Sequence, residues 1–437
     1  MTKLNPAVLT AILALACALP SAAQKIAVPL AIAPQAAAPQ APVSGVVEAE
    51  WNFLKAAGQD NEKDVLELTL PQLEDWLVRN PENPNSGEAQ LLKADLHLKL
   101  GDYKSALVDL LKHFQAYPQA ASAEGARNLF TDTLAKKADK KTRPALEEAS
   151  LAPVKAAADN NISSLLEKLS VSAGEVYYEP LIAEFRDFFN RFSGFAKNDE
   201  LRLALADLHQ KNGEYLAAKL AYEKMIQLHP LSPLLARAKR SLGGVLADNL
   251  KEYDKAIEVY QAIAAAFPGT DEAWTAYSRL PALAEKQKKY DLAVEIQEKI
   301  IELYPDREEA YNSYKAEARV LRDKLGKFPE AVAVLNRLAD KYKGERAIAA
   351  LLLAAEIYRK DMKAGEDEVK MYDRIVAEYE TDPQAPKALY AAGEVYDKAK
   401  DTEKAREYYQ KVMEKYPDDP LSKKAEKRVS AIVSGKS

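Results

Sequence analysis

A segment of about 37 residues recurs along this chain of 437 residues, and the recurrence limits the possible folds more than any other feature. One copy reads KEYDKAIEVYQAIAAAFPGT from residue 251, and another reads KKYDLAVEIQEKIIELYPDR from residue 288. When the copies are aligned on one small residue, they are 37 or 38 residues apart, or a multiple of that; the small residues are Ala106, Ala218, Ala256, Ala293, Ala331 and Ala405. A repeat of this length is typical of an array of helical units.

Within each copy the spacing of apolar residues predicts a helix. In the copy around Ala256, Tyr253 stands three residues before the small residue, Tyr260 four after it and Ile263 seven after it. These offsets place the side chains on one helical face. Pro268, which stands twelve residues after Ala256, ends the helix. The stretch before each copy is also helical, and a Gly-Asp or Gly-Glu pair supplies the turn between the two helices.

The repeat predicts an all-α fold, a right-handed α-solenoid of antiparallel helix pairs spanning residues 46–433. Few glycines and many Ala, Leu, Lys and Glu residues favour helix throughout. The array holds about ten units on this count, including a degenerate one near Val369 and Tyr372. The pattern is nearly lost over residues 120–175, so the geometry of that section is left open.

The later copies resemble the tetratricopeptide repeat family. Gly393, Tyr396, Ala405, Tyr409 and Pro417 match the family's glycine, tyrosine, alanine, aromatic and proline positions. The chain differs in lacking the family's tryptophan in the first helix of the good copies, and its period exceeds the usual length of about 34 residues. The resemblance is greatest to bacterial envelope members, such as the repeat lipoprotein of the outer-membrane β-barrel assembly machine and the repeat protein of the Tol–Pal system. It implies a superhelical scaffold whose concave groove binds proteins.

The two ends of the chain do not belong to the repeat pattern. A short apolar stretch and the small residues before Gln24 predict that residues 1–23 are a secretory signal peptide. The alternative is a lipoprotein signal, with a lipid anchor on Cys17 and an outer-membrane location. Residues 24–45, rich in alanine and proline, are expected to form a flexible tether, and residues 434–437 a disordered tail. The mature chain is therefore expected to be periplasmic or secreted, with no transmembrane span.

No motif in the chain predicts catalysis or a cofactor. Metal-protease, nucleophile-elbow and phosphate-loop patterns are absent from the sequence. His97 and His209 occupy equivalent repeat positions three periods apart, too distant to share a metal ion, so no metal, cofactor or catalytic residue is predicted. The formal net charge of −5 argues against binding nucleic acid through a basic surface.

Acidic residues recur on one face of the first helices. Eight residues before the small residue stand Asp248, Glu285, Asp323 and Asp397, and eleven before it stand Asp95, Asp207 and Glu394. Because the two offsets differ by three, these residues share a helix face. In the resembling family that face lines the concave groove, so these residues and Tyr390 are predicted to bind a partner with a basic segment. The alternative is a solvated face, since lysines follow directly, as at Lys286 and Lys398.

These features predict a non-catalytic protein-interaction scaffold of the bacterial envelope. One alternative is a peptidoglycan-processing enzyme, or a regulator of one, that carries a helical solenoid. Another is a component of a polysaccharide export or secretion complex. The sequence does not identify the partner protein.

Overall fold

A computed structural model describes residues 43–154 and 157–434. The predicted signal peptide, nearly all of the predicted tether and residues 435–437 of the predicted tail lie outside this range. The chain divides into two compact units, residues 1–56 and 57–437. The described part of the first unit is essentially one helix, α1 (Val43–Ala57). The repeat lies in the second unit.

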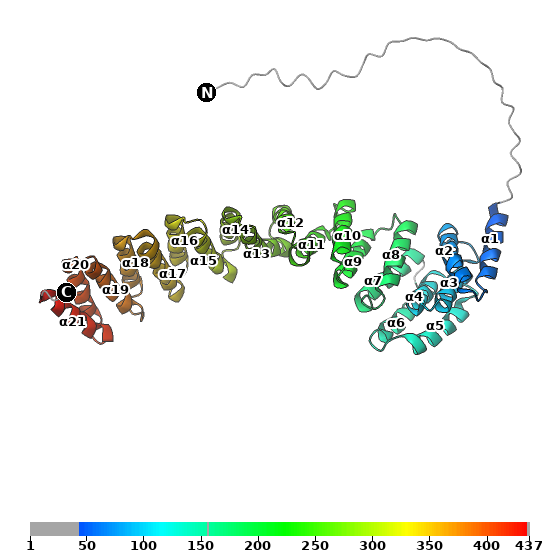
Figure 1. The fold of residues 1–437 in the computed structure, drawn as a ribbon, viewed down its shortest axis with the longest axis horizontal. Helices are drawn as coiled ribbons and strands as arrows, with labels where there is room; N and C mark the ends of the chain where they lie inside the picture. The colour runs from blue at the N-terminus through cyan, green and yellow to red at the C-terminus, as the bar shows by residue number, and fades with distance from the viewer. Residues whose placement is uncertain (1–42, 155–156, 435–437) are drawn as a thin grey trace, which may run out of the picture. The chain divides into compact units, whose positions relative to one another are not determined.

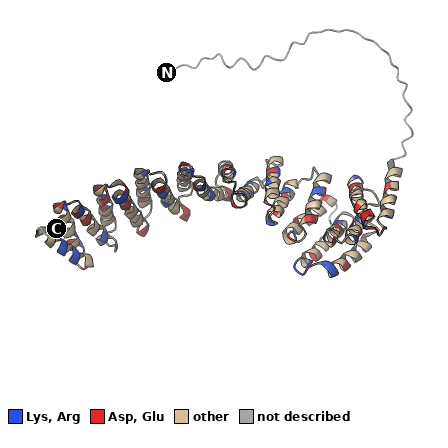
Figure 2. Cartoon of the chain, in the orientation of Figure 1, with Lys and Arg blue, Asp and Glu red and all other residues tan. Residues whose placement is uncertain are grey.

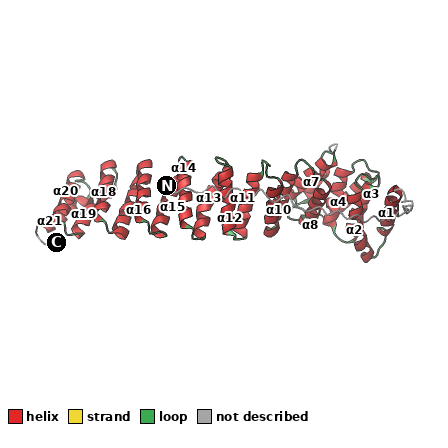
Figure 3. Ribbon diagram, turned by 90° about the horizontal axis from the view of Figure 1, so that it is seen from above, coloured by secondary structure: helices red, strands yellow, loops and turns green. Residues whose placement is uncertain are grey.

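The described residues form helices joined by short turns, with no strand among them (Figures 1 and 3). Two helices, α11 and α17, continue into π-helical turns, η1 (Val245–Asn249) and η2 (Tyr358–Met362). The α-helices of the second unit are, in chain order, α2 (Lys63–Arg79), α3 (Ser86–Lys99), α4 (Tyr103–Ala116), α5 (Ala123–Lys137), α6 (Arg143–Ser150), α7 (Ala158–Ser172), α8 (Tyr178–Arg191), α9 (Asn198–Lys211), α10 (Tyr215–Leu228), α11 (Leu235–Gly244), α12 (Tyr253–Ala266), α13 (Asp271–Lys286), α14 (Tyr290–Leu303), α15 (Glu308–Asp323), α16 (Phe328–Lys341), α17 (Glu345–Ile357), α18 (Gly365–Glu378), α19 (Ala385–Lys398), α20 (Thr402–Lys415) and α21 (Pro420–Val433).

Helices that follow one another in the chain pack together as antiparallel pairs. The pairs are α3–α4, α7–α8, α9–α10, α11–α12, α13–α14, α15–α16, α17–α18 and α19–α20. Each second helix also packs on the first helix of the next pair, as α12 does on α13. The predicted all-α solenoid of helix pairs is confirmed.

The second helices begin and end where the repeat pattern places them. The aromatic residue is the first residue of the helix, as Tyr253 is in α12, and the small residue Ala256 is fully buried. Phe267 caps the carboxyl end of α12, and Pro268 follows it directly. Because these signals lie within one helix, they could be read from the sequence alone.

The turn between the two helices of a pair needs a left-handed residue. Glycine takes this position at Gly101, Gly213 and Gly326, with φ between 64° and 88°. In other units lysine adopts the same conformation, with φ between 56° and 62°, at Lys251, Lys288, Lys363 and Lys400. A residue with a Cβ atom is strained there.

Residues 123–150 depart from the regular pairing. Helix α6 is short, and α4 packs directly on α7 and α8. A buried charge cluster forms where α3, α4 and α8 meet. In it, Lys112 Nζ lies 2.6 Å from both Glu184 and Asp187, and Lys93 Nζ lies 3.1 Å from Asp109. Burial alone would lower the pKa of Lys112, but the two carboxylates beside it raise the pKa above its ordinary value.

The degenerate unit near Val369 contains a complete helix, α18. Glu368 takes the place of the small residue and is buried, at 3% exposed. It accepts a hydrogen bond from the Tyr372 hydroxyl at 3.0 Å, and the Arg359 guanidinium of η2 lies 3.9 Å from it. Burial raises the pKa of Glu368. A search for small residues misses this unit because a paired carboxylate replaces the alanine.

Candidate functional site

The first helices of neighbouring units contact each other and form one surface, which we call the first-helix face. Contacts of this kind join α7 to α9, α11 to α13, and α19 to α21. Acidic and basic residues are interspersed along the helices of the second unit (Figure 2). The predicted binding residues lie on these first helices, so their individual partners decide what the face offers to a ligand.

Four of the predicted carboxylates form ion pairs with the next unit. Each meets an arginine 30 to 34 residues further along the chain; the pairs are Asp207–Arg237, Asp248–Arg279, Glu285–Arg319 and Asp397–Arg428. The Asp207 pair is 2.8 Å long, the Glu285 pair 2.7 Å, and Arg428 Nε lies 2.9 Å from Asp397. The pairs therefore join the first helices of successive units.

A buried tyrosine of the second helix completes two of these pairs. The Tyr222 hydroxyl donates to Asp207 at 2.5 Å, and the Tyr409 hydroxyl donates to Asp397 at 3.2 Å. Burial raises the pKa of both phenols, and the acceptor carboxylates raise it further. Asp207 and Asp397 therefore each join the two helices of their own unit and also contact the first helix of the next unit.

The remaining predicted residues are not joined to the next unit in this way. Asp95 pairs with Lys99 of its own helix at 3.2 Å, and Asp323 lies 4.0 Å from its neighbour Arg322. Glu394 is exposed, whereas Tyr390 is half-buried with its ring 5.2 Å from that of Tyr409. The structure therefore gives a surface of alternating charges, in which the four paired carboxylates are already neutralised by arginines.

These arginine partners were not predicted from the sequence. Arg428 stands on the last helix among other basic residues, Lys423, Lys424 and Lys427, and it contacts Asp397. The signal was present as a spacing of 30 to 34 residues between carboxylate and arginine. Such a signal is weak because charged residues are frequent throughout the chain.

One pocket on the first-helix face lies between α7, α9 and α11, with a volume of about 470 Å³. Leu203, Ala204 and Leu208 of α9 form its floor. Val171 is 76% exposed at its edge, unusual for a large apolar side chain. Charged groups of both signs surround the opening: Glu167, Glu200, Asp207, Lys211 and Arg237. The pocket offers an apolar floor within a charged rim.

Two smaller pockets also contain predicted residues. One, of about 320 Å³ between α15 and α17, has an apolar wall including Leu353 and Ile357, and Asp323 stands at its rim with three cations. The other, of about 250 Å³, contains Glu394 and the buried Glu368. Three predicted residues, Asp207, Asp323 and Glu394, therefore lie in pockets that the sequence pattern could not show.

The two histidines at equivalent repeat positions, His97 and His209, each contact a side chain of the fold. His97 Nδ1 lies 2.6 Å from Asp109, and His209 Nδ1 lies 2.7 Å from the Tyr178 hydroxyl. Among the described residues, no group of three histidine, cysteine or acidic side chains is placed to hold a metal ion. Within that same range, no helix is both long and apolar enough to cross a membrane.

Two segments match models of the tetratricopeptide repeat, residues 203–271 and residues 387–419. These two segments are therefore tetratricopeptide repeats. Proteins with these repeats generally act as protein-interaction scaffolds and are typically non-catalytic. No curated protein matches the chain.

Solved structures with similar folds include three at low identity. A tetratricopeptide repeat protein from Parabacteroides merdae is 14% identical, with 62% of this chain and 99% of that one covered and a TM-score of 0.32. The tetratricopeptide domain of P58(IPK) is 16% identical, with coverage of 90% and 99% and a TM-score of 0.23. The pilF protein of Pseudomonas aeruginosa is 16% identical, with coverage of 53% and 98% and a TM-score of 0.29.

Proposed function

Because the chain contains tetratricopeptide repeats, we propose that it is a non-catalytic scaffold of the bacterial envelope that binds partner proteins on its first-helix face. The pocket between α7, α9 and α11 is the observation that carries this proposal. It combines an apolar floor, an exposed Val171 and charged groups around the opening. Protein interfaces commonly have this apolar centre and polar rim.

The partner segment has a chemistry that complements this pocket. An apolar side chain of the segment sits on Leu203 and Ala204, where it buries apolar surface. Charged groups of both signs surround the opening, and Asp207 is paired with Arg237 and Glu200 with Lys197, so polar residues of either charge beside the apolar one find a partner at the rim. Asp323 and Glu394 extend the contact to the later pockets. The paired carboxylates contribute mainly by holding the first helices in register.

The envelope location rests on residues 1–23 and on the resemblance to envelope repeat proteins. Signal-peptide cleavage after Ala23 should give a mature chain that begins at Gln24. Mass spectrometry of the protein from periplasmic extract measures where the mature chain begins. Retention of the chain in the membrane fraction, abolished by Cys17→Ala, would instead establish the lipid-anchored form. A cytoplasmic protein that keeps residues 1–23 would contradict export.

Affinity capture from envelope extract tests the binding site. Ala204→Arg places a long charged side chain on the floor of the pocket and should abolish capture of the partner bound by the wild-type chain. Leu220→Arg is the matched control, since Leu220 is 66% exposed on the second helix α10. Equal capture by both variants would contradict binding at this pocket, provided that both melt like the wild type.

A further inference from the structure

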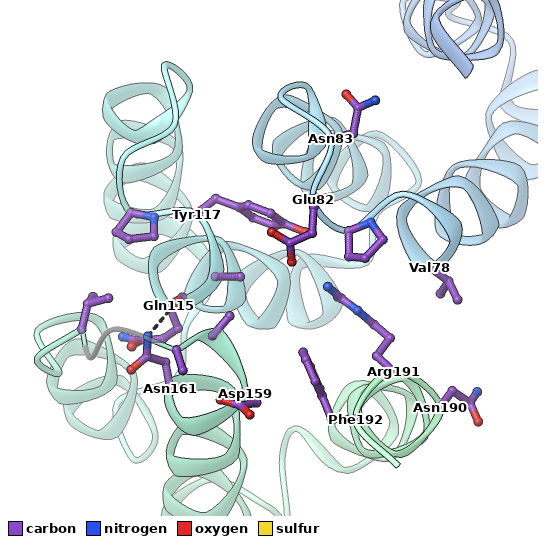
Figure 4. A pocket seen from close by; sticks show the side chains of 16 residues that line it. Val78, Glu82, Asn83, Gln115, Tyr117, Asp159, Asn161, Asn190, Arg191 and Phe192 are labelled. Carbon is purple, nitrogen blue, oxygen red and sulfur yellow. Dashed lines mark hydrogen bonds between the residues drawn. The ribbon is translucent and has the colours of Figure 1, made fainter. Parts of the chain in front are cut away.

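A fourth pocket, of about 720 Å³, lies at the ends of the second helices and is larger than the three described above (Figure 4). Its walls come from the carboxyl ends of the second helices α2, α4 and α8 and from the start of α7. It shares no lining residue with the three pockets described above. Its volume falls in the range of about 300–1,000 Å³ that small-molecule sites occupy.

The irregular packing around α4 brings these helix ends together. Since α4 contacts α7 and α8 directly, the end of α4 faces the end of α8. The Asn161 side chain of α7 donates a hydrogen bond to the backbone carbonyl of Gln115 at 3.1 Å, which ties α7 to the end of α4. The pocket is thus a built feature of this break in the repeat.

Two polar groups in the pocket wall have no hydrogen-bond partner among the described residues. They are Nε of Arg191, whose side chain is 9% exposed, and the hydroxyl of Tyr117. Figure 4 shows the Arg191 side chain extending from α8 toward Glu82. Arg191 is paired with Asp187 through Nη1 at 3.6 Å, so its Nε and the Tyr117 hydroxyl are the polar atoms of this wall that a polar ligand could satisfy.

The charges around the pocket favour a neutral ligand. Among the described lining residues, Glu82 and Asp159 carry negative charge and Arg191 carries positive charge, so charges of both signs are present. The carboxyl ends of α2, α4 and α8 add partial negative charge, and the amino end of α7 adds partial positive charge. The two carboxylates disfavour an anion. The buried guanidinium in turn disfavours a ligand with strong positive charge.

Amide side chains and flat apolar surfaces supply the remaining wall. An amide both donates and accepts hydrogen bonds, as a hydroxyl-rich ligand requires, and the exposed Asn190 offers one to the pocket. The other amides, Asn83, Gln115 and Asn161, each hold a backbone group of the chain and keep some bonding capacity of their own. The rings of Tyr117 and Phe192 offer apolar faces on which the C–H face of a sugar ring can pack. We propose that this pocket binds a neutral oligosaccharide, independently of any protein bound on the first-helix face.

Saturation-transfer NMR on the mature chain tests the proposal with cellotriose, maltotriose and chitotriose as neutral probes. A galacturonic acid trimer and trialanine are the charged-sugar and peptide comparisons. At least one neutral trisaccharide should bind, with an affinity that changes little with salt because no net charge is neutralised. Binding of only the anionic sugar or only the peptide would overturn the ligand class, and no binding of any neutral probe would overturn the site.

Substitutions then locate the bound sugar. Asn190 is exposed, so Asn190→Ala should leave folding intact and weaken binding about tenfold by removing one amide. Tyr117→Phe should weaken binding similarly, because it removes only the orphaned hydroxyl. Asn312→Ala, at an exposed amide of α15, is the matched control and should bind like the wild type. Unchanged affinity in both Asn190→Ala and Tyr117→Phe would place the sugar elsewhere and overturn the proposal.

Discussion

Single residues decide how closely the two helices of a unit approach. A Cβ atom added at Gly243 of α11 would lie 2.8 Å from the ring of Tyr260, and one added at Gly393 would lie 2.7 Å from that of Tyr409. Both tyrosines are buried, so neither ring has room to move away. The glycine on the first helix and the tyrosine on the second are therefore one packing unit.

Gly243→Ala should destabilise the protein by about 1–2 kcal/mol. Overpacking costs about 1–3 kcal/mol, and the better helix propensity of alanine offsets up to about 1 kcal/mol of that. The adjacent Gly244 has open space around it, so Gly244→Ala should stabilise by about 0.5–1 kcal/mol. Urea denaturation measures both free energies of unfolding; a shift of the same sign in the two variants would contradict the packing described here.

Glu317 of α15 makes stability depend on pH. It is 3% exposed, and burial, together with repulsion from Glu298, raises its pKa to about 7 despite the nearby Arg337. The pKa of Glu317 in the folded protein lies above its ordinary value of 4.5, so the folded state binds the proton more tightly than the unfolded state. The stabilisation that the protonated Glu317 gives to the fold is therefore complete below pH 4.5 and is lost as the pH rises through 7.

Glu317→Gln should remove this pH dependence. The loss in the wild type between pH 5 and pH 8 amounts to at most about 3 kcal/mol, and the variant should be the more stable of the two at pH 8. Thermal melts of both proteins across that pH range measure the difference. Parallel pH curves for wild type and variant would show that Glu317 titrates normally.

At the scale of elements, the sequence predicted what lies within one helix or one turn. The starts of the second helices, the buried alanines and the prolines after the caps all follow from local spacing. The arginine partners stand 30 to 34 residues from their carboxylates, and the pockets form between separate helices, so no pattern within one helix shows them. In the sequence, the irregular helices α5 and α6 appear only as a loss of the repeat pattern. That loss does not predict that α4 packs directly on α7 and α8.

The left-handed turn between paired helices predicts that two opposite substitutions change the free energy of unfolding in opposite directions. Lys288 has φ of 57° at the position where Gly213 stands in another unit. Lys288→Gly should stabilise by about 0.5–1 kcal/mol, because glycine avoids a strain of about 1–2 kcal/mol while losing more freedom on folding. Gly213→Lys should destabilise by a similar amount. Chemical denaturation of both variants measures the two shifts, and equal signs would mean that the turn conformation does not limit stability.

At the scale of the whole second unit, most packing joins neighbours in the chain, while the buried charges of α3, α4 and α8 join more distant segments. Repeat arrays held by neighbour contacts lose stability locally when one unit is damaged. Lys112 is the cation at the centre of this buried charge cluster, and its side chain is 4% exposed.

Lys112→Met should cost about 3 kcal/mol, since it leaves Glu184 and Asp187 with only their longer contacts to Lys93 and Arg191, at 3.5 and 3.6 Å. Hydrogen exchange followed by mass spectrometry should show faster exchange in α3, α4, α7 and α8 and unchanged exchange in α15 to α21. Lys299→Met, which removes an exposed pair with Glu295, is the control and should cost at most about 0.5 kcal/mol. Loss of protection along the entire chain in Lys112→Met would contradict neighbour-limited coupling.

The central claim is that partner proteins bind on the first-helix face, and photo-crosslinking in intact cells tests it most directly. A photoreactive amino acid placed at Val171 lies at the edge of the pocket between α7, α9 and α11, and one placed at Leu220 lies on the exposed surface of α10. We expect one discrete crosslinked protein from position 171, lost on adding Ala204→Arg, and none from position 220. Crosslinks from position 220 alone, or crosslinks at 171 that survive Ala204→Arg, would contradict the account.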